Sequence, residues 1–478
     1  METTRWAERA APRYCDDRSG TENLTEWCGL AVEKRAIPKQ RLDCRARAVL
    51  STGGLAAAIG LLVATLGVGC AAPLSVKAAA RGDRVALKIA MGEEKARGKL
   101  DQKRVAEVAK AVAEREIRQA QGPEALARID EARACWRPLA GSLEQRAQRS
   151  DDPGAGATLA LMDGRNRARD GEALVRKHAT SSNPLWRAVA ARAAVGVKLG
   201  SARRTFYVDP DERVRLAALR AALELSDPAD SAALLEVARL DPNTVAQAIA
   251  VRAAAGVASA DVVLALRDRY ATADEGLRQS IVDAWGRPEL AKAGGRREIV
   301  TVAENQSGAA AIEAGAWLLQ MGGDPEARAA GQRALLRAMG EGLSRDRVLA
   351  IGRAPIADRD VFAAMQKAAR DADVPVKIAA LIRLEEVTEE RSKASAELRK
   401  LADGGARDAL FALARAGDPV AVERVVKELS STDAEVRLRA MNVLVTAGRF
   451  ASAADLLADA HPGVRMRASC AVLSARSP

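Results

Sequence analysis

The sequence predicts an all-α protein built from stacked pairs of short helices. Aromatic residues make up only 3% of the 478 residues. Alanine, leucine, valine and arginine dominate instead, which suits close packing of helices through small side chains and disfavours strands. Beyond residue 154 the chain also repeats one short pattern of polar and apolar positions. Such a repeat is typical of an array in which each unit packs only on its neighbours.

Residues 1–47 differ from the rest of the chain. They show no helical periodicity and contain Cys15, Cys28 and Cys44. We interpret this stretch as a disordered cytosolic leader or as an over-extended gene prediction, with translation starting nearer the segment that follows.

Residues 48–70 form an apolar segment. No charged residue occurs between Ala48 and Gly69, and three arginines precede it within the last seven leader positions. A positive flank followed by an apolar run is the pattern of an export signal. The run ends in Leu-Gly-Val-Gly-Cys70, which resembles the lipobox of bacterial lipoproteins. The resemblance implies cleavage before Cys70 and its lipidation. An uncleaved transmembrane anchor and signal-peptide cleavage after Ala72 are the alternatives.

Residues 71–153 predict an N-terminal helical region. Between residues 100 and 117 the apolar side chains Val105, Val108, Val112 and Ile117 keep to one helical face, while charged residues take the other. A second helical run follows and contains Cys135. We expect this region to cap the array that comes next.

Residues 154–478 contain the repeat, which is clearest around one basic position. Six residues before it stands Ser or Asp, four before it Asn, Asp or His, one before it Val or Trp, and three after it Ala. The basic position is occupied by Arg187, Arg215, Lys377, Arg437 and Arg465. A weaker unit fits around Gln247, and degenerate units lie near Arg278, Ala311, Arg347 and Arg407.

Each position of the repeat has a physical role. The Ser or Asp six residues before the basic position is a helix-capping residue type, so we expect the second helix of each unit to begin there. The Val and the Ala are four residues apart and share a face, which predicts burial against the next unit. The basic side chain lies just beyond that face. We expect it to reach an Asp or Asn of a neighbouring turn or repeat, forming a ladder along the stack.

This pattern of Asp, then Val-Arg, then Ala resembles the HEAT repeat, in the short form also found in phycobilin lyase subunits. The resemblance covers residues 154–478, two thirds of the chain. It implies a right-handed α-solenoid of stacked helix pairs, in which the second helices line a concave groove. The resemblance predicts the fold specifically but indicates almost nothing about function.

Little catalytic chemistry is available in this composition. The net charge of +11 comes from 74 Lys and Arg against 63 Asp and Glu, interleaved along helix faces as expected for solvated surfaces. Of two histidines, His461 occupies a capping position and His178 ends a helix, where a basic side chain complements the dipole. Cys135 and Cys470 lie too far apart for a redox or zinc motif, and we expect both to be small buried hydrophobes.

We therefore expect no enzyme, cofactor or metal site. The favoured function is a non-catalytic scaffold that binds a protein or peptide in its concave groove as a monomer. It would be a membrane-tethered lipoprotein of the cell envelope, in the outer membrane or facing the periplasm, or else anchored in the inner membrane. Nucleic acid is the less favoured partner. The fold family leaves two alternatives: a DNA glycosylase-like nucleic-acid binder and a bilin lyase-like enzyme.

Overall fold

The structure is a computed structural model. It describes residues 72–120, 175–196, 199–225 and 227–475, together with a few residues between these ranges, namely Arg128, Glu131, Ala132, Cys135, Leu139, Glu172 and Ala173. The predicted leader (1–47) and apolar segment (48–70), including Cys70, lie outside the described residues, as do residues 140–171, where the predicted array would begin.

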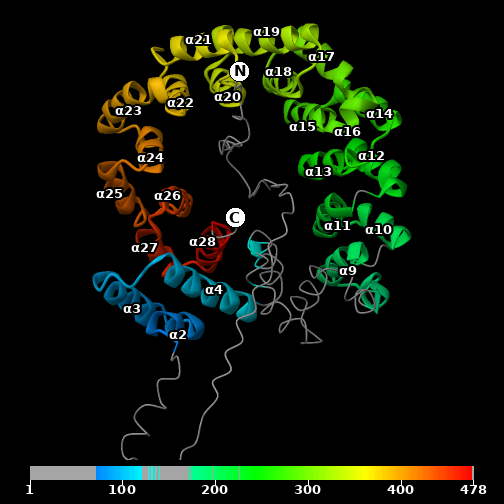
Figure 1. The fold of residues 1–478 in the computed structure, drawn as a ribbon. Helices are drawn as coiled ribbons and strands as arrows, with labels where there is room; N and C mark the ends of the chain where they lie inside the picture. The colour runs from blue at the N-terminus through cyan, green and yellow to red at the C-terminus, as the bar shows by residue number, and fades with distance from the viewer. Residues whose placement is uncertain are drawn as a thin grey trace, which may run out of the picture.

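Every regular element among the described residues is a helix, and the helices form two concentric rows along a curve (Figure 1). This arrangement confirms the predicted all-α solenoid of helix pairs. The inner row consists of α9 (Pro184–Gly196), α11 (Glu212–Leu225), α13 (Thr244–Ala254), α15 (Glu275–Gly286), α18 (Ala309–Met321), α20 (Ser344–Arg353), α22 (Val374–Leu384), α24 (Arg407–Arg415), α26 (Ala434–Thr446) and α28 (Pro462–Ser474).

The outer row holds the first helix of each pair. It consists of α10 (Gly200–Tyr207), α12 (Ser231–Leu240), α14 (Ala260–Thr272), α17 (Arg296–Asn305), α19 (Pro325–Glu341), α21 (Arg359–Ala368), α23 (Thr388–Asp403), α25 (Pro419–Glu428) and α27 (Phe450–Ala453) with η4 (Ala454–Ala458). Short turns η2 (Pro228–Asp230), α16 (Pro288–Leu290) and η3 (Ala291–Gly295) connect the pairs. Successive inner helices contact one another from α9 to α28.

Small side chains let the inner helices approach closely. The alanines of the repeat pattern, such as Ala218, Ala380 and Ala468, are almost fully buried, and so are Val214 and Val376 on the same faces. The predicted packing face of the repeat is therefore the one that the structure buries. An alanine at such a face keeps the backbones near each other while still removing apolar area from water.

The tightest backbone approach joins α18 to α19. A β-carbon added to Gly315 would lie 2.9 Å from the carbonyl oxygen of Gly331, and one added to Gly331 would lie 2.8 Å from that of Gly315. Neither position has room for a side chain, because the opposing atoms belong to backbone.

A Gly331→Ala variant is expected to lose about 1–3 kcal/mol of unfolding free energy, the usual cost of overpacking. Gly340→Ala in the same helix is the matched control, since nothing lies within 4 Å of its added β-carbon. The control should be neutral or stabilising, because alanine suits a helix interior better than glycine. Urea unfolding of the two variants measures the difference, and equal midpoints would contradict the close approach.

The N-terminal helices α2 (Leu74–Arg81), α3 (Arg84–Ala96) and α4 (Gln102–Gln119) pack against the C-terminal end of the array. Helix α4 packs on α28, and α3 packs on η4, at the C-terminal end (Figure 1). Their buried residues, among them Val108 and Ile117, belong to the same hydrophobic core as Val464 and Val472 of α28. Val189 of α9, the first inner helix, belongs to this core as well. The sequence predicted a cap for the following repeat and missed the contact with the last helix, which the curvature of the array brings to the N-terminal ones.

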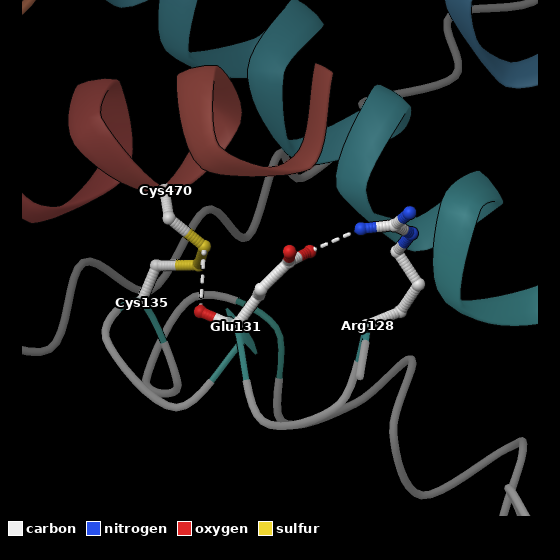
Figure 2. The surroundings of a disulfide bond; sticks show 4 residues. All are labelled: Arg128, Glu131, Cys135 and Cys470. Atoms are coloured by element: carbon white, nitrogen blue, oxygen red, sulfur yellow. Dashed lines mark hydrogen bonds and ion pairs between the residues drawn. A yellow bond between two sulfur atoms is a disulfide. The ribbon is translucent and has the colours of Figure 1, made fainter. Parts of the chain in front are cut away.

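Two polar links reinforce this closure. Arg465 of α28 donates to one carboxylate oxygen of Glu116 in α4, from Nε at 2.8 Å and from Nη2 at 2.7 Å. A disulfide joins Cys135 to Cys470, with Cα atoms 5.0 Å apart (Figure 2). The two cysteines are buried as expected, but the prediction that they serve only as small hydrophobes is wrong. They are covalently paired although 335 residues separate them.

Candidate functional site

The predicted ladder is a row of bidentate ion pairs between neighbouring repeats. Arg187 donates to Asp209 at 2.8 and 2.9 Å. Arg215 donates in the same way to Asp241 at 2.7 and 3.2 Å. Near the C-terminus Arg437 donates to Asp459 at 2.9 and 3.3 Å. In each pair the acid stands six residues before the basic position of the next repeat. For Asp241 that position is occupied by Gln247 of the weaker unit.

The third guanidinium nitrogen ties each ladder arginine to its own repeat. Nη1 donates to the carbonyl oxygen six residues earlier: Ser181 for Arg187 at 2.7 Å and Ser431 for Arg437 at 2.8 Å. A guanidinium offers a fixed fork of donors, so one side chain can hold two repeats in register. Lysine lacks this fork, and Lys377 makes a different contact, to Glu397 at 3.4 Å.

The acid six residues before the basic position is not the helix cap that the sequence predicted. Asp209 accepts from the backbone N–H of Asp211 at 2.9 Å, and Asp211 in turn accepts from the N–H of Arg213 at 2.9 Å. The second helix therefore begins two residues later than predicted, with the residue four before the basic position as its N-cap. Since the earlier acid completes only the turn, its carboxylate remains available to the arginine of the preceding repeat.

Arg465 occupies the last ladder position among the described residues. It keeps the ladder geometry, donating to the carbonyl oxygen of Asp459 at 2.7 Å, but its acid is Glu116 of α4. Both side chains are buried, with 10% and 7% of their surface exposed. The N-terminal region thus supplies the carboxylate that a further repeat would have supplied.

Arg347, in a degenerate repeat, also keeps the ladder contact, to Asp371. This hydrogen bond from Arg347 is the main reason that the pKa of the Asp371 carboxyl is lowered. A carboxyl with a lowered pKa in the folded state stabilises the fold above its unfolded pKa of about 4, and the contribution is lost as the pH falls through the folded value.

An Asp371→Asn variant should therefore be less stable than the wild type at pH 7. The difference should shrink as the pH falls below about 4, where the wild-type carboxyl becomes protonated. Urea unfolding across this pH range measures the effect. Asp403→Asn is the control, because the Asp403 side chain is 74% exposed and should give little difference at any pH. A gap between wild type and Asp371→Asn that stays constant with pH would contradict the ion pair.

The two histidines have structural roles. His461 is the N-cap of α28 and its Nδ1 accepts from the N–H of Gly463 at 3.2 Å, at the capping position identified in the sequence. His178 ends a short helical turn, but its ring is buried and stacked 4.0 Å from Trp186, and burial lowers its pKa. The structure therefore shows a buried ring stacked on Trp186, in surroundings that disfavour the cation expected at a helix end.

A groove runs along the inner row in the C-terminal half of the array. Its cavity volume is about 670 Å³. Five successive inner helices, α20, α22, α24, α26 and α28, contribute its walls. The groove-lining arginines are Arg345, Arg407, Arg439 and Arg467. The sequence analysis placed Arg407 at the centre of a degenerate repeat, but it did not single out the other three.

A second row of ion pairs crosses this groove. Arg439 of α26 donates to Asp408 of α24 at 2.5 Å, and Arg467 of α28 donates to Glu435 of α26 at 2.6 and 3.0 Å. Arg439 also lies over the ring of Phe411 at 4.8 Å. In the sequence, Arg439 and Arg467 could have been noticed because each follows a ladder arginine by two residues. Only the folded helices show that this position faces the groove.

The most buried charged cluster lies elsewhere, between α10 and η2. Arg203 donates to Asp230 at 2.7 Å, and the Tyr207 hydroxyl donates to the same carboxylate at 2.9 Å. All three are nearly inaccessible, and burial raises the pKa of Tyr207. This network holds one repeat to the next. Among the described residues no group of His, Cys, Asp and Glu has the arrangement of a metal site.

These features define the class of the protein: a HEAT-like α-solenoid whose N-terminal helices close it against its last repeat. No family model and no curated protein matches the chain. A solved structure described as "Kap95p Binding Induces the Switch Loops of RanGDP to adopt the GTP-bound Conformation" is similar at 12% identity and a TM-score of 0.26. The match covers 76% of this chain but only 52% of that one. The fold assignment therefore rests on the helices of this chain.

Proposed function

We propose that the protein is a non-catalytic scaffold that binds a protein or peptide partner in the groove of its inner row. The observation that carries the proposal is the groove itself, which spans five consecutive helices and presents the exposed side chains of Arg345, Arg407, Arg439 and Asn442. Solenoids present extended concave surfaces of this kind to their partners. Neither histidine lines the groove, and its acids Asp408 and Glu435 are engaged by arginines.

Site-specific photo-crosslinking in intact cells tests the scaffold proposal. A photoreactive amino acid at Asn442, an exposed groove residue, should give a discrete protein adduct. The same probe at Lys393 of the outer helix α23, 80% exposed, is the matched control and should give none. Equal adducts from both positions, or none from Asn442, would argue against binding in the groove.

We further propose that the protein works in the cell envelope, tethered through Cys70. The lipobox-like end of the apolar segment supports this, and so does the Cys135–Cys470 disulfide, because disulfides persist in oxidising compartments and are rare in the cytosol. Within the part of the chain that the structure describes, no helix is both long and apolar enough to cross a membrane.

Labelling cells with a radioactive fatty acid tests the tether. The wild type should be labelled and fractionate with membranes, whereas a Cys70→Ala variant should lose the label. Cys44→Ala, which removes another cysteine on the N-terminal side of the array, is the control and should keep it. A wild type that is unlabelled and found in the cytosolic fraction would overturn the localisation.

A further inference from the structure

The two rows of helices in the C-terminal half carry different charge. The five inner helices α20 to α28 contain eleven arginines and lysines against three acids. The outer elements of the same half, α19, α21, α23, α25, α27 and η4, contain eleven basic residues against ten acids. The excess positive charge therefore lies on the inner row.

Structural ion pairs account for part of this excess positive charge, but not for the exposed arginines that line the groove. Arg347, Lys377, Arg437 and Arg465 make the ladder and closure contacts. By contrast Arg345 and Arg407 line the groove with 70% and 54% of their side chains exposed. Their nearest acids stand at 3.8 and 3.5 Å, and such exposed pairs contribute little to stability.

The groove combines these charges with an apolar floor. The floor side chains are Val348, Ile378, Ala379, Phe411 and Leu438. Helices pack about 8–10 Å apart, so the four spacings between five inner helices span about 32–40 Å. An extended chain rises about 3.3 Å per residue, and about 10–12 residues would fill that length.

We infer that the groove binds an extended acidic peptide segment in which glutamate or aspartate alternates with apolar residues. In an extended chain alternate side chains point to opposite sides, so apolar ones meet the floor while acids reach the arginines of the rim. The inference rests on the proposed scaffold function and names its partner's chemistry. Charge complementarity of this kind governs the rate and specificity of association.

A peptide suits the groove better than a nucleic acid. Among the described residues that line the groove, Phe411 is the only aromatic one, and it is 1% exposed and covered by Arg439, so these residues offer no ring for stacking on bases. Asp408 and Glu435, paired with Arg439 and Arg467, interrupt the positive charge of the groove, which therefore suits spaced acids better than a dense row of phosphates. A peptide with spaced acids avoids both difficulties.

Fluorescence anisotropy with the full chain tests the inference. The probe is a labelled peptide of about 12 residues that alternates glutamate and leucine. The groove variant Arg345→Glu/Arg407→Glu should raise its Kd at least about tenfold. The matched control Lys393→Glu/Lys400→Glu changes the net charge equally on outer helix α23, where both side chains are more than 70% exposed, and should change Kd less than about twofold.

Two further probes separate the possible failures. If a glutamine-and-leucine peptide binds as tightly as the acidic one and both lose affinity in the groove variant, the acidic inference falls while the scaffold proposal stands. If neither peptide binds, both the acidic inference and the scaffold proposal are contradicted. Both are also contradicted if only an oligothymidylate binds and the groove variant abolishes that binding. Circular dichroism of both variants confirms that the helices remain folded.

Discussion

An Arg465→Met variant is expected to lose about 1.5–3 kcal/mol of unfolding free energy, the usual contribution of hydrogen bonds to a charged group. The partner is Glu116, which lies in α4, is 6% exposed and keeps one other hydrogen bond, from Arg115 at 3.2 Å. Methionine keeps the apolar stem of the side chain but removes the donors to Glu116 and to the carbonyl of Asp459. Because this pair lies where α28 meets α4, hydrogen exchange of the α4 amides should increase as well.

Two comparisons make this prediction specific. A double variant Glu116→Leu/Arg465→Met should recover part of the loss, since it removes the buried carboxylate that has lost two of its donors. The recovery is partial because Arg115, 20% exposed, then loses the same acceptor. Arg97→Met removes an arginine from an exposed pair with Glu93, whose side chains are 64% and 50% exposed, and should cost at most about 1 kcal/mol. An Arg465→Met variant as stable as Arg97→Met would contradict the buried closure.

Removal of the disulfide is the second large effect that we expect. A Cys135→Ser/Cys470→Ser variant should lose about 2–5 kcal/mol, because the bond closes a very long loop and restricts the unfolded chain. Both cysteines are buried, 3% and 5% exposed. In the native protein the bond should therefore resist reductants that cleave it rapidly in denaturant.

Thiol alkylation followed by mass measurement tests this disulfide directly. Protein from an oxidising compartment, denatured without reductant, should leave Cys135 and Cys470 unmodified. Free thiols at both positions would overturn the assignment. The effects of disulfide loss and of Arg465→Met should not be additive, since both act on the same contact between the ends of the array.

Helix α28 is both a wall of the groove and the helix that contacts the N-terminal region. The groove walls extend to α28, the helix held by Glu116 and by Cys135. A partner that lies along all five inner helices therefore contacts a helix whose position depends on the N-terminal region. Variants that loosen the contact between α28 and the N-terminal region should weaken peptide binding, because they displace Arg467 without substituting any residue of the groove.

Much of the solenoid could be predicted from local pattern alone. Capping residues, an alanine at helical spacing and one recurrent basic position are all set within about one repeat, so they can be read along the chain. The ladder contacts of Arg187, Arg215 and Arg437 reach an acid of a neighbouring repeat as predicted, and the structure shows that it is the following one. The helix start was placed two residues early because both Asp209 and Asp211 have side chains suited to a cap.

The groove could be predicted only in outline. The sequence indicated that second helices line a concave surface, but not which of their exposed positions face inward. That depends on the rotation of each helix about its axis, and it brings Arg439 beside Asp408 and Arg467 beside Glu435. His178 shows the same limit, because only the fold places Trp186 against its ring.

By itself the sequence determined the helix pairs, their spacing, their buried alanine faces and the ladder that links them, because each depends on residues within one or two repeats. Only the tertiary structure decided that the array meets its own N-terminal helices, that Arg465 pairs with Glu116 and that Cys135 pairs with Cys470. The physical reason is that closure depends on the small rotation at every repeat, summed over the whole array. The residues of one repeat do not determine this accumulated rotation.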